Sequence, residues 1–145
     1  MSSEDIGKWR KAGKLARDAL NYGKTLIQKK SSMLDVTNKI EKFVIDNNGE
    51  LAFPTNLAVN NVGAHWTPSS KSKDVFDNGD LVKLDVGVHI DGYIGDNALT
   101  VEIGSSKHTK MIEASREALN AAIEVAAPGI NTGMIGSAVQ DVIEG

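Results

Sequence analysis

The chain of 145 residues contains no cysteine, few prolines and few aromatic side chains. The absence of cysteine excludes disulfide bonds, zinc–thiolate sites and thiol catalysis. No stretch approaches about 18 consecutive apolar residues, so no transmembrane helix is predicted. The start, Met1 to Asp5, is acidic and lacks the basic and apolar regions of a signal peptide. We therefore expect a cytoplasmic protein with no membrane partner.

Positive charge is also scarce, with 16 basic residues against 19 acidic ones and a net charge of -3. Such a chain has no broad positive field for phosphate groups, and we expect no specific nucleic-acid partner. Apolar residues make up 41% and charged residues 24% of the chain, the balance of an ordinary globular protein. The length is enough for one domain with one sizeable core.

Helical periodicity is present at both ends of the chain. The second predicted helix starts at Ser32, whose hydroxyl can cap it with Asp35 three residues on, and ends at Asn47-Asn48-Gly49. Later helices with apolar faces turned inward are predicted over Thr109 to Ala127 and from Asn131 or Thr132 onward. In the first predicted helix, apolar or small residues recur at three-and-four spacing and indicate one buried stripe: Ile6, Trp9, Gly13, Ala16, Leu20, Gly23 and Ile27.

Between Glu50 and Ile103 the periodicity is that of extended chain. Apolar residues alternate with other types from Val82 to Ile90, which predicts a half-buried strand. Asp91-Gly92 then suits the positive φ angles of a two-residue hairpin turn, and a returning strand is predicted from Tyr93. Helices, strands and helices in this order predict an α+β fold with an antiparallel sheet.

The predicted hairpin places two carboxylates on one face. A turn at Asp91-Gly92 pairs Gly87 with Asp96, and cross-strand partners share a face. Asp85 shares that face because side chains two residues apart on a strand point the same way. Asp85 and Asp96 are then diagonal neighbours, about 7–8 Å apart. Gly87 opposite Asp96 is expected to leave room for an ion.

Two aspartates on one strand face repel each other, and aspartate is depleted in strand interiors. A divalent cation between them would remove the repulsion and use their oxygens as hard ligands. The alternative is a solvated face, with Lys83, Asp85 and His89 as ordinary exposed side chains. Alternation does not distinguish solvent from a cleft, so the pattern leaves both interpretations open.

Longer motifs are more specific than this pattern. Ala52-Phe53-Pro54-Thr55-Asn56-Leu57 and Asn60-Asn61-Val62-Gly63-Ala64-His65-Trp66-Thr67-Pro68 resemble the AFPxN…N…AHxTP segment of type 2 methionine aminopeptidases. Gly79 to Asp96 resembles the first metal hairpin of that family, and Ala127-Pro128-Gly129 also matches its pattern. The resemblance covers essentially the whole chain. It is closest to the archaeal form, because the first helix begins almost at Met1.

The resemblance implies the pita-bread (creatinase/aminopeptidase-like) fold, in which two related α+β halves surround a curved antiparallel sheet with helices on one face. This family removes the initiator methionine from nascent polypeptides when the next residue is small. The implied substrates are the N-termini of nascent polypeptides in the vicinity of the ribosome, and the full-length protein is expected to be a monomer. The implied cofactors are two divalent metal ions, and Co²⁺, Mn²⁺, Fe²⁺ and Zn²⁺ all fit oxygen ligands.

By this comparison Asp85 and Asp96 correspond to two of the family's metal ligands, with Asp96 bridging both ions. His65 corresponds to the histidine that hydrogen-bonds the substrate near its scissile bond, and is both a catalytic and a substrate-binding candidate. Phe53 and Pro54 would help to line the methionine pocket, where an aromatic ring suits sulfur. A plain core position is the alternative for Phe53.

The family's other ligands, a histidine and two glutamates, lie in its second half, beyond residue 145. We therefore expect residues 1–145 to be the N-terminal portion of a methionine aminopeptidase catalytic domain, truncated and inactive alone. Proline-specific peptidases of the same fold are an alternative, but they follow the second aspartate with a Thr-Arg-Thr-like segment where Asn97 to Thr100 stands here. Another alternative, a non-catalytic binding module, generally lacks the metal carboxylates.

Overall fold

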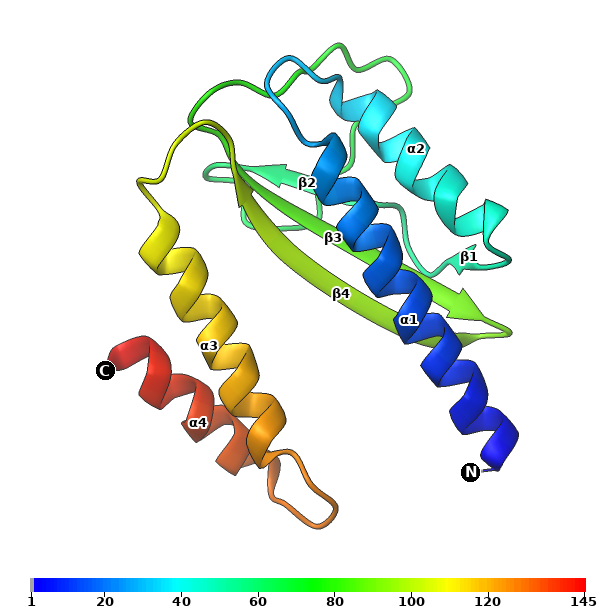
Figure 1. Cartoon of the computed structure of the whole chain (residues 1–145), viewed down its shortest axis with the longest axis vertical. Helices are drawn as coiled ribbons and strands as arrows, with labels where there is room; N and C mark the ends of the chain where they lie inside the picture. The colour runs from blue at the N-terminus through cyan, green and yellow to red at the C-terminus, as the bar shows by residue number, and fades with distance from the viewer. Residues whose placement is uncertain (1) are drawn as a thin grey trace. The chain divides into compact units, whose positions relative to one another are not determined.

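The computed structural model describes residues 2–145. They form two compact units, the first ending at Ser105 and the second running from Ser106 to Gly145. Figure 1 shows the strands and the first two helices, which belong to the first unit, and the last two helices, which belong to the second. The first unit consists of α1 (Ser3–Leu26), α2 (Met33–Asp46), β1 (Glu50–Leu51), β2 (Asn56–Val59), β3 (Leu81–Ile90) and β4 (Tyr93–Glu102).

Strand β3 lies at the centre of an antiparallel sheet. β4 pairs along one of its edges, and β2 and β1 pair with successive parts of the other. The hairpin turn is formed by Asp91 and Gly92, whose φ angles of 52° and 83° are the positive pair that a tight hairpin requires. The predicted register is confirmed, with Gly87 opposite Asp96.

The core lies between one face of this sheet and helices α1 and α2; Figure 1 shows α1 crossing the long strands β3 and β4, with α2 beside it. Burial of each large aliphatic side chain contributes about 1.5–3 kcal/mol. Asp85 lies on the opposite face, so the core holds its strand without using its carboxylate. The core residues of β3 follow the predicted period of two and are 0% exposed: Val82, Leu84, Val86 and Val88.

Helix α1 begins at a complete capping box between Ser2 and Asp5. The predicted buried stripe is wrong at its start, because Ile6 and Trp9 are 40% and 45% exposed. Trp9 instead contacts the edge of Tyr93, beside the hairpin turn, with ring centroids 5.4 Å apart. Further along, small residues let the helix lie close to β4. The buried residues of α1 are Ala12, Ala16, Ala19, Leu20 and Gly23.

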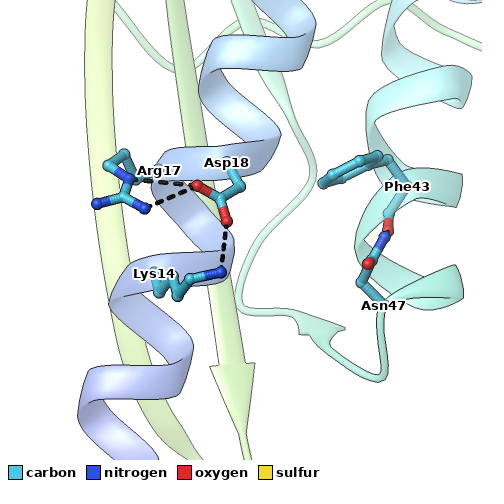
Figure 2. Close-up of polar contacts among 5 residues, drawn as sticks. All are labelled: Lys14, Arg17, Asp18, Phe43 and Asn47. Carbon is cyan, nitrogen blue, oxygen red and sulfur yellow. Dashed lines mark hydrogen bonds and ion pairs between the residues drawn. The ribbon is translucent and has the colours of Figure 1, made fainter.

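Helix α2 is capped at Ser32, as predicted, because the Ser32 hydroxyl accepts from the N–H of Asp35 at 3.3 Å. At its other end the Asn47 side chain donates to the carbonyl of Phe43 at 2.8 Å. Figure 2 shows Phe43 and Asn47 on α2, and shows Lys14 and Arg17 on α1 both turned toward Asp18. These hydrogen bonds, that of Arg17 first, lower the pKa of Asp18.

The second unit is a pair of helices that pack on each other, α3 (Thr109–Val125) and α4 (Thr132–Glu144). Two helices alone bury only the sides that face each other, so the prediction that apolar residues lie inward is wrong for several of them: Met111, Leu119, Ile123 and Ile143 are 52%, 57%, 62% and 56% exposed. No helix within residues 2–145 is long and apolar enough to cross a membrane.

Candidate metal centre

The carboxylates of Asp85 on β3 and Asp96 on β4 line a cavity of about 500 Å³. The cavity lies in the first unit, on the sheet face opposite the one that α1 and α2 cover. Asp85 is half-buried and Asp96 is exposed. The structure brings together all five residues that the sequence predicts for the site, and adds two others. The lining consists of Phe53, Pro54, Asn56, His65, Thr67, Asp85 and Asp96.

The carboxylate of Asp85 is poorly satisfied by the protein. Its Oδ1 atom is buried and has no hydrogen-bond partner. Burial is the main cause that raises the pKa of Asp85, and the neighbouring charge of Asp96 raises it further. A hydrogen bond from Asn56 and the charge of His65 oppose this shift. A cation beside Oδ1 would supply the missing partner, so the donor set fits a divalent ion.

The two carboxylates do not make a complete metal site by themselves. Within the described part of the chain, no three His, Cys, Asp or Glu side chains gather closely enough to hold a metal ion. Hard divalent cations take about six oxygen ligands, whereas two carboxylates supply at most four oxygens. Asp85 and Asp96 therefore suit a metal centre but do not enclose one.

The space beside Gly87 is filled, which corrects the expectation that an ion has room there. A Cβ atom at Gly87 would lie 2.6 Å from both Cδ1 and Cζ of Phe53. The backbone explains this placement, because the N–H of Ala52 donates to the carbonyl of Gly87 at 3.0 Å and so brings the next residue over β3. The half-buried Phe53 ring forms the cavity wall beside Asp96, and Pro54 is exposed next to it.

His65 is exposed at the cavity and has φ 57°, a left-handed conformation that is uncommon outside glycine. The residues after it hold it in place. The carbonyl of Trp66 accepts from the N–H of Leu57 at 2.8 Å. The hydroxyl of Thr67 donates to the carbonyl of Thr55 at 3.0 Å. His65 thus reaches the cavity from a segment attached alongside β2.

The interpretation as an ordinary solvated face does not fit, because none of Lys83, Asp85 and His89 is exposed. Lys83 donates to the carbonyl of Asn60 at 2.6 Å, and burial lowers its pKa. His89 accepts from the N–H of Gly92 at 3.3 Å, which gives it a structural contact at the turn. Asp85 is the member of this row whose buried oxygen lacks a partner.

Asn56 and Thr67 are the lining residues that sequence reasoning missed. Both stand inside the quoted motifs, yet no pattern indicates what they contact. Asn56 is paired directly with Asp85 across β2 and β3. The signal that could have found it is this pairing, but the long connection between the two strands carries no tight-turn pair to set the register.

Comparison with known proteins gives consistent matches. A sequence profile described as Metallopeptidase family M24 matches residues 7–145. The methionine aminopeptidase of Archaeoglobus fulgidus is 40% identical over 143 residues, which are 99% of this chain and 48% of that protein. That of Pyrococcus horikoshii is 40% identical over 139 residues, 96% of this chain and 47% of that protein. This chain thus spans about half the length of the curated relatives it matches.

Among solved structures, a methionine aminopeptidase from Rickettsia prowazekii matches with a TM-score of 0.89 and 27% identity, covering 99% of this chain and 61% of that one. The prolidase from Pyrococcus horikoshii matches with a TM-score of 0.86 and 28% identity, covering 99% of this chain and 42% of that one. The α+β pita-bread fold predicted from the sequence is therefore confirmed, as is the resemblance to archaeal methionine aminopeptidases.

Proposed function

Because this chain belongs to metallopeptidase family M24, we propose that it forms the N-terminal portion of a methionine aminopeptidase catalytic domain. The substrate is the N-terminus of a nascent polypeptide, from which the initiator methionine is removed when the next residue is small. The observation that carries this proposal is the Asp85–Asp96 pair, with its buried unpartnered oxygen, in one cavity with His65 and Phe53. The names of the relatives, at 40% identity, support it.

Asp85 and Asp96 would hold two divalent ions together with ligands that this chain does not supply. Co²⁺, Mn²⁺, Fe²⁺ and Zn²⁺ all accept carboxylate oxygens. When bound, such a pair of ions supplies activation of water at neutral pH. Asp96 is exposed and lines the cavity, which suits a bridging position, and Asp85 contributes its unpartnered Oδ1.

In this proposal, His65 and Phe53 bind the substrate. The exposed imidazole of His65 donates a hydrogen bond to the substrate near its scissile bond, where negative charge develops. The Phe53 ring offers an apolar wall for the methionine side chain, because thioether sulfur packs favourably against aromatic rings. Pro54, exposed beside Phe53, extends this wall.

The proposed location is the cytoplasm, near the ribosomes where nascent N-termini emerge. The full-length enzyme is proposed to be a monomer. The 145-residue chain alone is expected to be inactive, since two carboxylates do not enclose two ions. A proline-specific peptidase is the second candidate, because a prolidase shares the fold closely. The AFPxN motif at Ala52 to Asn56 and the segment Asn97 to Thr100 favour the methionine aminopeptidase.

A hybrid enzyme tests the proposal. The matching half of the Archaeoglobus fulgidus protein is replaced by this chain, and hydrolysis of Met-Ala-Ser and of a Met-Pro dipeptide is measured with Mn²⁺ or Co²⁺. We expect methionine release from Met-Ala-Ser that Asp85→Ala or Asp96→Ala abolishes. Circular dichroism of each variant controls for folding. A folded hybrid that cleaves only Met-Pro would support the prolidase candidate instead.

A further inference from the structure

We propose that Thr67 is a positioning residue that acts through Asn56: its hydroxyl holds the Asn56 carboxamide so that the amide NH₂ faces Asp85. This leaves Oδ1 of Asp85 available to a cation. The inference rests on the proposed function, in which Asp85 is a metal ligand. It assigns roles to the two cavity-lining side chains that neither composition nor motif explains.

The backbone register places Asn56 against Asp85. The two residues are direct partners across β2 and β3. Direct partners have Cβ atoms about 4.5–5.5 Å apart and point to the same face, so a short amide and a short carboxylate meet there. The Asn56 side chain lines the same cavity as Asp85, so its amide lies within reach of that carboxylate. Oδ1 of Asp85 has no hydrogen-bond partner, and this oxygen is left for a cation.

The chemistry of the two groups sets which end of the amide must face Asp85. An ionised carboxylate only accepts hydrogen bonds, whereas a carboxamide has a donor end and an acceptor end. The NH₂ group of Asn56 must therefore point to Asp85, and its Oδ1 must point away. A reversed amide would set oxygen against oxygen beside a half-buried charge.

Thr67 supplies the donor that the outward oxygen needs. Its Oγ1 lies 3.1 Å from Oδ1 of Asn56 and 3.0 Å from the carbonyl oxygen of Thr55. A hydroxyl has one proton, so it donates to these two acceptors in turn. Both acceptors belong to adjacent residues at the start of β2, and the hydroxyl ties the segment that carries His65 to them. Thr67 thus links the position of His65 to the orientation of the amide that contacts Asp85.

The first test uses isotope-labelled wild-type chain and its Thr67→Val and Thr67→Ser variants. Thr67→Val keeps the shape and removes the hydroxyl, and Thr67→Ser restores the hydroxyl. Thr37→Val is the matched control, because Thr37 is a buried threonine on α2 whose Oγ1 has no hydrogen-bond partner. NMR follows solvent exchange of the Asn56 side-chain NH₂ and the broadening of Asp85 and Asp96 signals by Mn²⁺ alone.

We expect Thr67→Val to speed exchange of the Asn56 NH₂ at least about fivefold and to weaken Mn²⁺ binding about 10- to 100-fold, the range for partners that orient metal ligands. Thr67→Ser should stay within about twofold of wild type, and Thr37→Val should change neither measurement. Unchanged amide exchange and unchanged Mn²⁺ affinity in Thr67→Val would overturn the role of Thr67. The Mn²⁺ measurements are made on the hybrid enzyme, which supplies the remaining ligands. Absence of any Mn²⁺ effect in the hybrid with the wild-type sequence would contradict the proposed metal site, and with it the proposed role of Thr67 in cation binding.

A double-mutant cycle with Asn56→Ala tests whether Thr67 acts through Asn56 and also covers the case in which Thr67→Val folds poorly. If the inference is correct, Asn56→Ala weakens Mn²⁺ binding by itself, and adding Thr67→Ser or Thr67→Val produces no further loss. Residues that act independently would instead give additive losses. Full additivity would overturn the link between the two side chains.

Discussion

The ring of Phe53 lies directly against the backbone of Gly87, so that a Cβ atom at Gly87 would come within 2.6 Å of Cδ1 of the ring. Gly87 stands opposite Asp96 on the candidate metal hairpin. The missing side chain therefore makes room for an aromatic wall next to the carboxylates. The apolar wall and the candidate metal-ligand pair are parts of one small surface, as the proposed recognition of an apolar N-terminal residue requires.

Gly87→Ala is expected to push the Phe53 ring out of its position. Overpacking of this kind destabilises a protein by about 1–3 kcal/mol. Urea unfolding of the variant measures the loss, and a Phe53→Ala background should remove most of it. Gly7→Ala is the control, because Gly7 lies within α1, near its start, and a Cβ there meets nothing within 4 Å. That substitution should leave stability equal or raise it by up to about 1 kcal/mol. Equal effects of the two substitutions would contradict the Phe53 contact.

Asp85→Asn is expected to stabilise the metal-free chain at neutral pH. The substitution removes a half-buried charge that Asp96 repels and that lacks a partner on Oδ1. The same substitution should weaken Mn²⁺ binding. Thermal unfolding with and without Mn²⁺ separates these two effects: the variant is more stable without the ion, and the wild type gains more stability when the ion is added. If the variant were less stable than wild type in metal-free buffer, Asp85 would instead be a residue that stabilises the fold.

Part of the site could be predicted from residues close in sequence. The two-residue turn Asp91-Gly92 sets every pairing between β3 and β4, so the shared face of Asp85 and Asp96 follows from local chemistry. The pairing of Asn56 with Asp85 depends on a long connection with no such turn pair. The pattern shows that Gly87 has no side chain, but only the three-dimensional path of the chain shows that Phe53 fills the space.

The fold, like the site, could be predicted from the sequence only in part. Period-two alternation correctly predicted the buried side chains of β3, because each lies in the middle of the sheet. Helical periodicity failed at Ile6 and Trp9, since α1 extends there toward the hairpin turn and its side chains meet Tyr93 rather than the sheet core. Periodicity indicates which side chains share a face, but the length over which the partner covers that face depends on the tertiary structure.

The contact between Tyr93 and Asp5 predicts a dependence of stability on acid pH. The Tyr93 hydroxyl donates to Asp5 at 2.5 Å, and this bond, followed by those from Ser2, lowers the pKa of Asp5 below its ordinary value. A carboxyl whose pKa is lower in the folded state stabilises the fold above the unfolded pKa, and this contribution is lost as pH falls through the folded pKa.

Tyr93→Phe removes the leading cause of that shift. The variant should be less stable than wild type at neutral pH, and this difference in the free energy of unfolding should shrink as the pH falls through the lowered pKa of Asp5. Urea unfolding between pH 2.5 and about 7 measures the difference. Tyr22→Phe is the control, because the Tyr22 ring stacks on Phe43, with ring centroids 5.0 Å apart, away from Asp5. A constant difference for Tyr93→Phe across the range would contradict the role of Asp5.

Substitutions at His65 separate stability from activity. The φ angle of His65 is 57°, and a non-glycine residue in this left-handed conformation carries a backbone strain of about 1–2 kcal/mol. His65→Gly should therefore be more stable than His65→Ala by about 1 kcal/mol in urea unfolding. In the hybrid enzyme both variants should lose methionine release to a similar degree, because both lack the imidazole. If His65→Gly restored activity together with stability, His65 would serve only to shape the loop. If neither variant recovers activity, the side chain itself is required, and the strained backbone is the conformation that directs it into the cavity beside Asp85 and Asp96.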